Sequence, residues 1–257
     1  MLLILYGTKE ARELMHLLLS NNYQVYGAAA TEYGLELAKQ DGALDVFFVV
    51  PKRNDLKKLL IDKRVQVVID ASQPFSSELS GITSQVCQQN KICYIRLQRK
   101  ETKLPEHPLI YPVSSWTEAA IKASELGKTV FLTTGSNNLE TFVNSKVMQG
   151  KRIVVRVLPE HRVVKKCQDL GLKPKDIVAL HGPFSTKFNR SIFKAYRADV
   201  IVTKDSGPSS GTNNKILAAL DLKIPVVVIK RDVTGDKNVV YNYKEILNLL
   251  RQTYAKN

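Results

Sequence analysis

The sequence has few cysteines, and they form no metal-binding or disulfide motif. Only three occur, at Cys87, Cys93 and Cys167, and no two of them are separated by two residues. Cys-x-x-Cys pairs are typical of structural zinc sites, and an even number of cysteines is typical of disulfide frameworks. The sequence therefore predicts reduced, structural cysteines, with neither a disulfide framework nor a metal site.

Long apolar runs are also absent. No stretch approaches the roughly 18 apolar residues of a membrane span, and the chain begins with a strand-like segment instead of the charged region of a signal peptide. With 257 residues and 44% hydrophobic content, the chain can bury a large core in one or two domains. We expect a globular, cytoplasmic, monomeric protein that does not bind membranes.

Acidic residues are scarce relative to basic ones. The chain has 24 Asp and Glu against 38 Lys and Arg, a formal net charge of +14, which attracts anionic partners. The basic residues are scattered, without a basic run interleaved with aromatics and without a nucleic-acid-binding motif. A small polyanion in a basic cleft therefore explains the charge as well as nucleic acid does, and lysines that solubilise helices contribute to it.

The first residues predict a strand, a tight turn and a helix. Leu2 to Tyr6 are apolar without polar alternation, which is typical of a strand buried on both faces. Gly7 allows a sharp turn and the close approach of a ligand, and Thr8 is placed to cap the helix that follows. A helix start at this position attracts phosphate. Because the three-glycine dinucleotide fingerprint is absent, an ordinary strand-to-helix turn is an equal alternative.

The same alternation of an apolar run and an amphipathic segment continues along the chain. Further strands are expected at 24–30, 45–50, 65–70, 92–96, near 111, and at 129–132, 153–158, 177–180, 200–203 and 226–229, with helices over 115–126 and after 241. This order specifies βαβ crossovers and parallel sheets. We predict an α/β protein with two Rossmann-like parallel-sheet domains facing a cleft, over residues 1–127 and 128–257.

Polar residues follow several expected strands, at the edge where open α/β sheets bind ligands. Segments 70–75 and 133–135 supply hydroxyl, carboxylate and amide groups, although turns and helix caps have the same composition. His181 follows another strand, and a single histidine is more often structural than catalytic. Lys204 begins the most polar turn; a lysine at the end of a buried strand indicates a ligand-binding group, so we interpret it as functional.

Seven short motifs, in this order, resemble the precorrin-6A reductase family of cobalamin biosynthesis, including its cobalt-precorrin branch. They are GTKEAR at 7–12, DASQPF at 70–75, RLQR at 96–99, TTG at 133–135, RVLP at 156–159, GPFS at 182–185, and TKDSG at 203–207 with a later glycine and Lys215. The resemblance implies a two-domain reductase that transfers a hydride from a nicotinamide cofactor to a macrocyclic double bond, giving precorrin-6B. The acetate and propionate groups of this tetrapyrrole suit the basic charge, and no nucleic-acid partner is expected.

The resemblance also implies roles for individual residues. The cofactor-binding candidates are Gly7, Thr8, Glu10, Ala11, Arg12, Asp70, Ala71 and Pro74. Physical reasoning about the polar strand ends adds the substrate-binding candidates Arg96, Thr134, Gly135, Ser206, Gly207 and Lys215, and makes Lys204 the catalytic candidate near the reacting end of the macrocycle. Because a nicotinamide would carry the hydride, neither a metal nor a covalent nucleophile is required.

Three positions depart from the family's pattern. Gln73 stands where the family usually has histidine, so a proton-donating role of that histidine has no counterpart here. The family's Arg-Pro-x-Trp ending is missing at Arg99 to Thr102, and Asn214 replaces the glutamate before Lys215. The sequence leaves both the metal-free and the cobalt-bearing macrocycle open, because the reduced bond is peripheral.

The end of the second strand bears on which nicotinamide cofactor is used. Thr31 and Glu32 follow it, and Glu32 lies after Gly7 at close to the roughly 20-residue separation of an acid that binds a ribose 2′-hydroxyl. No arginine between Arg12 and Arg53 is available for a 2′-phosphate. We therefore predict that NADH is preferred and NADPH is possible, with an acid that merely begins a helix as the alternative.

Two other classes of protein were weighed against a reductase of this family. The charge alone suggests a non-catalytic nucleotide- or RNA-binding protein with a Rossmann-like half. A short-chain dehydrogenase is disfavoured because no tyrosine is followed by a lysine four residues later.

Overall fold

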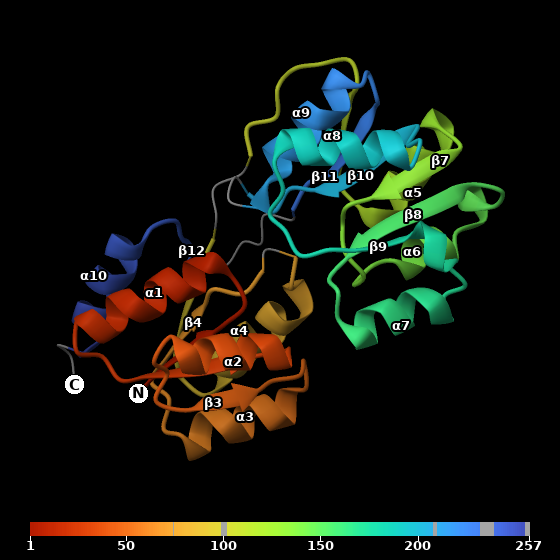
Figure 1. Ribbon diagram of the computed structural model, residues 1–257. Helices are drawn as coiled ribbons and strands as arrows, with labels where there is room; N and C mark the ends of the chain where they lie inside the picture. Colours follow the sequence, from red (N-terminus) through yellow and green to blue (C-terminus); the bar gives the residue numbers. More distant parts are fainter. Residues whose placement is uncertain (74, 99–101, 208–209, 232–238, 255–257) are drawn as a thin grey trace. The chain divides into compact units, whose positions relative to one another are not determined.

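The computed structural model describes residues 1–257 except 74, 99–101, 208–209, 232–238 and 255–257 (Figure 1). The chain divides into two compact units: unit 1 comprises residues 1–99 and 234–257, and unit 2 comprises residues 100–233. Each unit is built on a six-stranded sheet in which the paired strands run parallel. The predicted α/β class with two parallel sheets is confirmed.

This division differs from the predicted boundary at Gly127. Gly127 follows α5 (Trp116–Leu126) inside unit 2, and the end of the chain returns to unit 1. The reason is sheet pairing: β6 (Ile110–Val113) pairs with β11 (Val226–Ile229) in the second sheet. Local hydrophobic patterns carry no information about such a return.

The strands of unit 1 lie in the order β3-β2-β1-β4-β5-β12. They are β1 (Leu2–Leu5), β2 (Val25–Ala29), β3 (Val46–Phe48), β4 (Val67–Asp70), β5 (Cys93–Leu97) and β12 (Val239–Val240). From β1 the chain winds towards β3, and it then restarts at β4 and winds the other way. The carboxyl ends of β1 and β4 therefore form a topological switch point, where sheets of this kind bind ligands.

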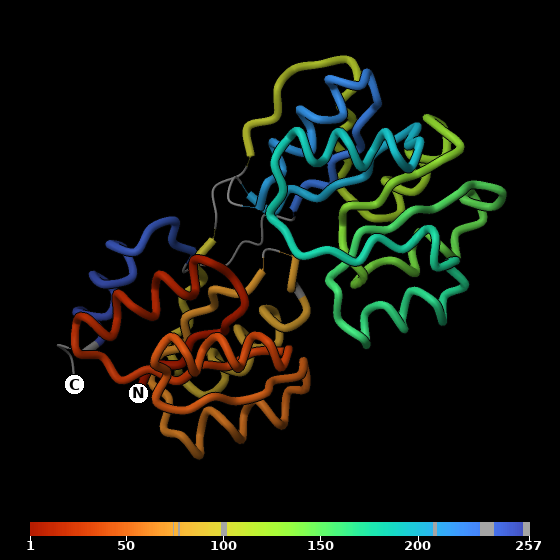
Figure 2. Tube along the Cα trace, in the orientation of Figure 1, coloured from red at the N-terminus to blue at the C-terminus, as the bar shows by residue number. Residues whose placement is uncertain are grey.

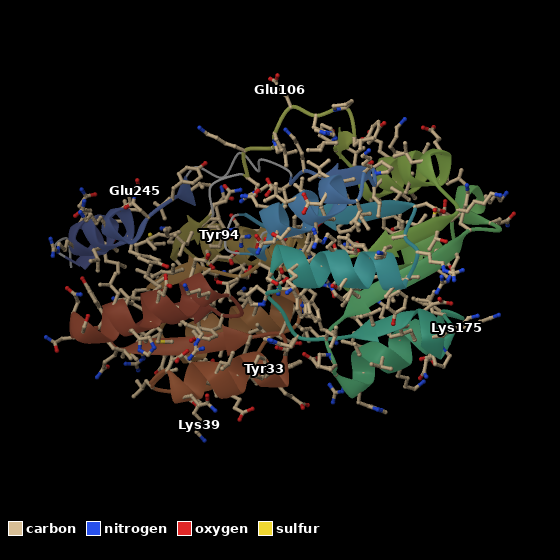
Figure 3. All side chains as sticks on the ribbon, turned by 45° about the horizontal axis from the view of Figure 1, so that its top comes forward. Tyr33, Lys39, Tyr94, Glu106, Lys175 and Glu245 are labelled. Atoms are coloured by element: carbon tan, nitrogen blue, oxygen red, sulfur yellow. The ribbon has the colours of Figure 1, made fainter. Side chains whose placement is uncertain are left out.

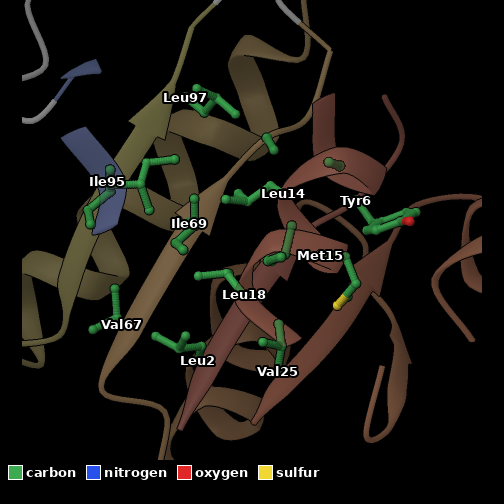
Figure 4. Packing of buried hydrophobic residues seen from close by; sticks show 14 of the residues in the cluster. Leu2, Tyr6, Leu14, Met15, Leu18, Val25, Val67, Ile69, Ile95 and Leu97 are labelled. Carbon is green, nitrogen blue, oxygen red and sulfur yellow. The ribbon is translucent and has the colours of Figure 1, made fainter. Parts of the chain in front are cut away.

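Helices cover both faces of this sheet (Figure 1). They are α1 (Lys9–Ser20), α2 (Glu32–Gln40), α3 (Arg53–Asp62), α4 (Ser77–Gln89) and α10 (Tyr243–Tyr254). Leu14 and Leu18 of α1 are fully buried in one cluster with Leu2 and Ile69 of the sheet (Figure 4). The chain ends with α10 beside α1 (Figure 2), where the Tyr243 hydroxyl donates to Glu13 at 2.7 Å.

The strands of unit 2 lie in the order β9-β8-β7-β10-β11-β6. The further strands are β7 (Thr129–Leu132), β8 (Arg152–Val157), β9 (Ile177–Ala179) and β10 (Val200–Lys204). Besides α5, the helices are α6 (Glu140–Val143), α7 (His161–Asp169), α8 (Thr186–Ala195) and α9 (Thr212–Asp221), with 3₁₀ turns η1 (Lys146–Met148) and η2 (Pro174–Asp176). The switch point of unit 2 lies between β7 and β10.

The two sheets share one spatial order. In each, five strands are arranged as 3-2-1-4-5 and a sixth strand completes the edge beside the fifth. In unit 1 the sixth strand is β12, which comes last in the sequence, whereas in unit 2 it is β6, which comes first. Each unit consequently has its own switch point.

Part of the positive charge lies on solvated surfaces. Lys39 of α2 and Lys175 of η2 are exposed and extend outward from their own units (Figure 3). No helix in the described ranges has the length and apolarity needed to cross a membrane. The same residues contain no group of three or more His, Cys, Asp or Glu side chains suited to a metal ion.

Candidate active site

The turn after β1 is fixed to the turn after β4 at the switch point of unit 1. Thr8 caps α1: its Oγ1 accepts from the N–H of Ala11 at 3.1 Å and donates to the carbonyl of Ala71 at 2.8 Å. Gly7 has φ of +140°, which favours glycine, and a Cβ built there meets no atom within 4 Å. Open space therefore lies over the backbone at the start of α1, as an anionic ligand would require.

Arg12 is used within the fold of unit 1. Its Nε and Nη2 donate to the Asp41 carboxylate at 2.8 and 2.9 Å, and the Tyr6 hydroxyl also donates to Asp41. Hydrogen bonds from Arg12 hold the pKa of Asp41 below its ordinary value. Ala11 is fully buried. The geometry thus gives Arg12 and Ala11 structural roles in joining α1 to the rest of the unit, and supplies no support for the predicted cofactor contacts.

Asp70 is fully buried at the end of β4 and forms an ion pair with Arg96 of β5, its partner in the sheet register. The Tyr94 hydroxyl donates to Asp70 at 2.7 Å, and the N–H of Ser72 donates at 3.0 Å. Burial opposes ionisation of Asp70, but the charge of Arg96 and these hydrogen bonds outweigh it and lower the pKa of the carboxyl. Asp70 is therefore an internal anion of unit 1.

The guanidinium of Arg96 also holds the turn that follows β4. It donates to Oγ of Ser72 at 3.0 Å, to Oγ of Ser80 at 2.6 Å and to the carbonyl of Gln73 at 3.3 Å, and Arg96 is only 6% exposed. These contacts favour a structural role over the predicted binding of a substrate carboxylate. Pro74, another predicted contact, lies outside the described residues.

Thr31, Glu32 and Glu10 lie at helix starts beside the switch point. Oγ1 of Thr31 caps α2 by accepting from the N–H of Gly34 at 3.0 Å, and Glu32 is the first residue of that helix. Thr31 and Glu32 are exposed just beyond the carboxyl end of β2, next to β1. Glu10 lies in the first turn of α1. This placement is compatible both with a ribose contact and with an acid at a helix N-terminus.

The TTG turn lies at the switch point of unit 2. The N–H and Oγ1 of Thr133 both donate to the carbonyl of Val202, at 2.8 and 3.1 Å, and so fix the end of β7 to β10. Thr134 is buried, and Gly135 has φ of +80°. The turn thus has a fixed backbone at the edge where a ligand is expected.

Three cations surround this turn. Lys204 ends β10, Arg156 lies near the end of β8, and Lys215 lies in the first turn of α9. Burial lowers the pKa of Lys204 to about 8 and that of Arg156 to about 10. Burial, together with repulsion by Arg156 and Lys204, lowers the pKa of Lys215 to about 7. We call Arg156, Lys204 and Lys215 the cationic cluster.

Within the cluster, Arg156 contacts neutral groups. Nη1 of Arg156 donates to Oδ1 of Asn189 at 2.7 Å, and its guanidinium lies 4.7 Å from the centre of the Phe184 ring. The amides of Asn189 and Asn214 both donate to the carbonyl of Phe184, at 3.3 and 3.1 Å. Within the described ranges, no carboxylate pairs with Arg156 or Lys215. A bound anion would therefore relieve the repulsion in the cluster.

Ser206 and Gly207 form the turn that follows Lys204. The N–H of Ser206 donates to the carbonyl of Lys204 at 3.0 Å, and Gly207 has φ of +87°. The structure thus brings Lys204, Ser206 and Gly207 to the same edge as the TTG turn, because β10 and β7 are neighbours. Arg96, by contrast, belongs to unit 1 and is not among them.

Arg156 is the functional candidate that the residue-level predictions missed. It was noted only as the first letter of the RVLP motif, although a charge inside the apolar strand Ile153 to Val157 is itself a signal. A buried cation without an acidic partner often marks a ligand site.

A sequence model of one family, described as "Precorrin-6x reductase CbiJ/CobK", matches residues 1–251. The chain belongs to this family of reductases of cobalamin biosynthesis. The resemblance stated from the seven motifs is confirmed, and the alternative of a non-catalytic RNA-binding protein is not favoured.

Individual relatives agree with this assignment over nearly the whole chain. Cobalt-precorrin-6A reductase from Priestia megaterium is 31% identical over 97% of this chain and 98% of the relative. The enzyme of that name from Salmonella typhimurium is 35% identical, over 91% and 90%. Precorrin-6A reductase from Sinorhizobium sp is 26% identical, over 99% and 94%. The solved structure of the CobK precorrin-6A reductase shares the fold, with a TM-score of 0.76, 21% identity and coverage of 98% and 96%.

Proposed function

We propose that this chain adds a hydride from a nicotinamide cofactor, together with a proton, to a double bond of cobalt-precorrin-6A or precorrin-6A. The observation that carries the proposal is the cationic cluster at the switch point of unit 2, in which Arg156 and Lys215 have no carboxylate partner among the described residues and which suits a macrocycle that bears several carboxylates. Family membership supplies the reaction class.

The residues at the switch point of unit 1 fit a nicotinamide dinucleotide. The open space over Gly7 and the capped start of α1 suit a pyrophosphate, and the exposed Glu32 beyond β2 suits an adenosine ribose. A carboxylate repels a 2′-phosphate, so this placement favours NADH over NADPH. When bound, the cofactor would supply the hydride, and the chain would orient it.

The residues at the switch point of unit 2 fit the macrocycle. Arg156 and Lys215 would bind its carboxylates, and Thr134 and Gly135 would line its edge. Lys204 would lie at the reacting bond: with a pKa of about 8 it holds a proton at pH 7 and releases it more readily than an ordinary lysine. The proposal requires the two switch points to share one cleft, which stays a prediction, as does a monomeric state.

Of the two macrocycles, we propose the cobalt-bearing one. Relatives named cobalt-precorrin-6A reductase from five organisms are 31 to 35% identical to this chain and the one from Synechocystis sp. is 24% identical, whereas the Sinorhizobium relative named precorrin-6A reductase is 26% identical. The reduced bond is peripheral, so this preference concerns the shape and charge of the substrate and requires no metal ligand from the chain.

Steady-state assays with both macrocycles and both nicotinamide cofactors test the proposal. We expect the cofactor to be oxidised only in the presence of a precorrin-6A substrate, as measured by the change in cofactor absorbance. The value of kcat/KM should be higher for NADH than for NADPH, and higher for the cobalt-bearing macrocycle than for the metal-free one. Tight binding of unrelated RNA together with no absorbance change would instead support a non-catalytic protein.

A further inference from the structure

Asp205 is a buried acid that directly follows Lys204 and has no assigned role. It is 4% exposed. Its carboxylate accepts from the N–H of Gly207 at 3.1 Å and from the N–H of Thr102 at 3.1 and 3.3 Å. Nη2 of Arg231, itself buried, lies 3.9 Å from Oδ2 of Asp205. One side chain therefore joins three segments that are distant in the sequence.

The three segments are the two ends of unit 2 and the turn that carries Lys204. Thr102 is the first described residue of unit 2 and Arg231 is the last. The sheet itself does not need these contacts, because the backbone N–H of Asp205 already donates to the carbonyl of Ile229 at 2.8 Å. A buried carboxylate is costly unless it is paired and hydrogen-bonded. Here Thr102 and Arg231 connect the carboxylate to the two ends of the unit, and the N–H of Gly207 lies within the turn itself.

We propose that Asp205 is a positioning residue that holds the Lys204–Gly207 turn in its functional conformation by fixing it to both ends of unit 2. The N–H groups of Thr102 and Gly207 need an acceptor oxygen, whereas Arg231 needs a charge. An asparagine satisfies the first need and not the second, so the two roles of the side chain are separable. Only the acceptor role, in which the side chain binds the N–H groups of Thr102 and Gly207, positions Lys204.

Unit 2 offers a matched control in Asp176. This acid is 7% exposed and forms an ion pair with Arg152, whose Nε lies 2.8 Å from Oδ1. Arg152 begins β8, so the pair lies at the amino edge of the sheet, opposite the cationic cluster. The Asp176→Ala variant measures how much stability unit 2 loses when a buried acid away from the cationic cluster is removed.

The experiment compares Asp205→Ala, Asp205→Asn and Asp176→Ala in the full chain. We expect Asp205→Ala to lower kcat by about tenfold to a hundredfold, as a misplaced catalytic group does, and Asp205→Asn to retain most of kcat. Thermal stability should follow another order, because Asp205→Asn removes the negative charge that lies 3.9 Å from the buried Arg231. Asp176→Ala should lose stability and keep kcat. Equal kcat in Asp205→Ala and Asp176→Ala would overturn the proposal.

Two further measurements keep the test decisive. If Asp205→Ala does not fold, the Asp205→Asn/Arg231→Met variant retains the acceptor oxygen and removes both the Asp205 and the Arg231 charges; a loss of kcat above about tenfold there would overturn the proposal. Amide hydrogen exchange requires no reductase activity: in Asp205→Ala, exchange should accelerate at residues 204–207 and at Thr102 together. If the unaltered protein has no reductase activity, the proposed function fails. If exchange does not accelerate at residues 204–207 and at Thr102 together, the proposed role of Asp205 is refuted.

Discussion

The two switch points have the same strand topology but differ in charge: the buried arginine of unit 1 is paired with an acid, whereas unit 2 gathers three cations. In unit 1, Asp70 and Arg96 are register partners on neighbouring strands and neutralise each other. In unit 2, the register that pairs Leu132 with Val155 brings Thr133, a neutral residue, beside Arg156. The identity of one residue on the adjacent strand thus decides whether a buried arginine is satisfied internally or keeps its charge for a ligand.

This difference predicts that substitutions of charged residues have unlike consequences in the two units. A charge that the fold uses internally should affect the free energy of unfolding when it is removed. A charge that the fold leaves uncompensated should affect binding and turnover instead.

The largest effect is expected for Arg96→Leu. Removing one partner of a buried ion pair leaves Asp70 as an uncompensated anion, so the free energy of unfolding should fall by about 3–5 kcal/mol, measured by urea denaturation. The Asp70→Leu/Arg96→Leu variant should recover part of this loss. A raised KM for the macrocycle with unchanged stability would contradict this role and restore the predicted role of Arg96 in binding substrate carboxylates.

Lys204→Met should show the opposite behaviour. We expect kcat to fall by about a hundredfold, or about 2.7 kcal/mol, while Tm stays constant or rises, because a half-buried charge is removed from a repulsive cluster. Lys187→Met, at an exposed position of α8, is the matched control and should change neither quantity. Near-normal turnover of Lys204→Met would show that its turn is only a connection between β10 and α9.

Glu32→Arg tests the ribose contact in unit 1. The ratio of kcat/KM for NADH over NADPH should fall by about tenfold or more, because an arginine pairs with the 2′-phosphate that the acid repels. Glu36→Arg, one turn later in α2, carries the same charge change and should leave the ratio in place. Native preference for NADPH would refute the role of Glu32 directly.

The smallest effect is a change in how stability depends on pH. The pKa of Lys215 is about 7 in the folded chain and 10.5 ordinarily, so between these values the unfolded state binds more protons. Stability should therefore rise with pH over this range, and Lys215→Met should flatten the rise. Affinity for a polycarboxylate should fall in the unaltered protein as the pH rises through about 7, because the lysine of the folded chain loses its charge there. Urea midpoints and KM, each measured against pH, check both trends.

Much of the fold could be predicted from the sequence because buried parallel strands are apolar throughout. Thr129–Leu132 and Val226–Ile229 match the structure at both ends, and the other expected strands are shifted by a residue or two. Val239–Val240 was missed, because two residues give no periodicity. Its pairing with β5 is what returns the end of the chain to unit 1.

The location of the candidate site could be predicted from the sequence, whereas the roles of its individual residues were harder to predict. Strand ends located Lys204, Thr134 and Gly7, since all parallel strands end at one edge. In segment 70–75, by contrast, Asp70 and Ser72 contact Arg96 within unit 1, and this was not predicted because the register partner of Asp70 cannot be read from local sequence. To recognise Arg156 as a candidate, one must know that it has no acidic partner in the part of the chain that the structure describes, and local sequence does not give this.

The place of β12 has a consequence for synthesis. The strands β1 to β5 of unit 1 precede unit 2 in the chain, whereas β12 and α10 follow it, and Ile246 and Leu250 of α10 are fully buried in the unit 1 core. The strands of unit 2, by contrast, all lie in one uninterrupted stretch of the chain. During translation, the intervening unit can therefore finish its sheet while the first waits with an open edge and an uncovered helix.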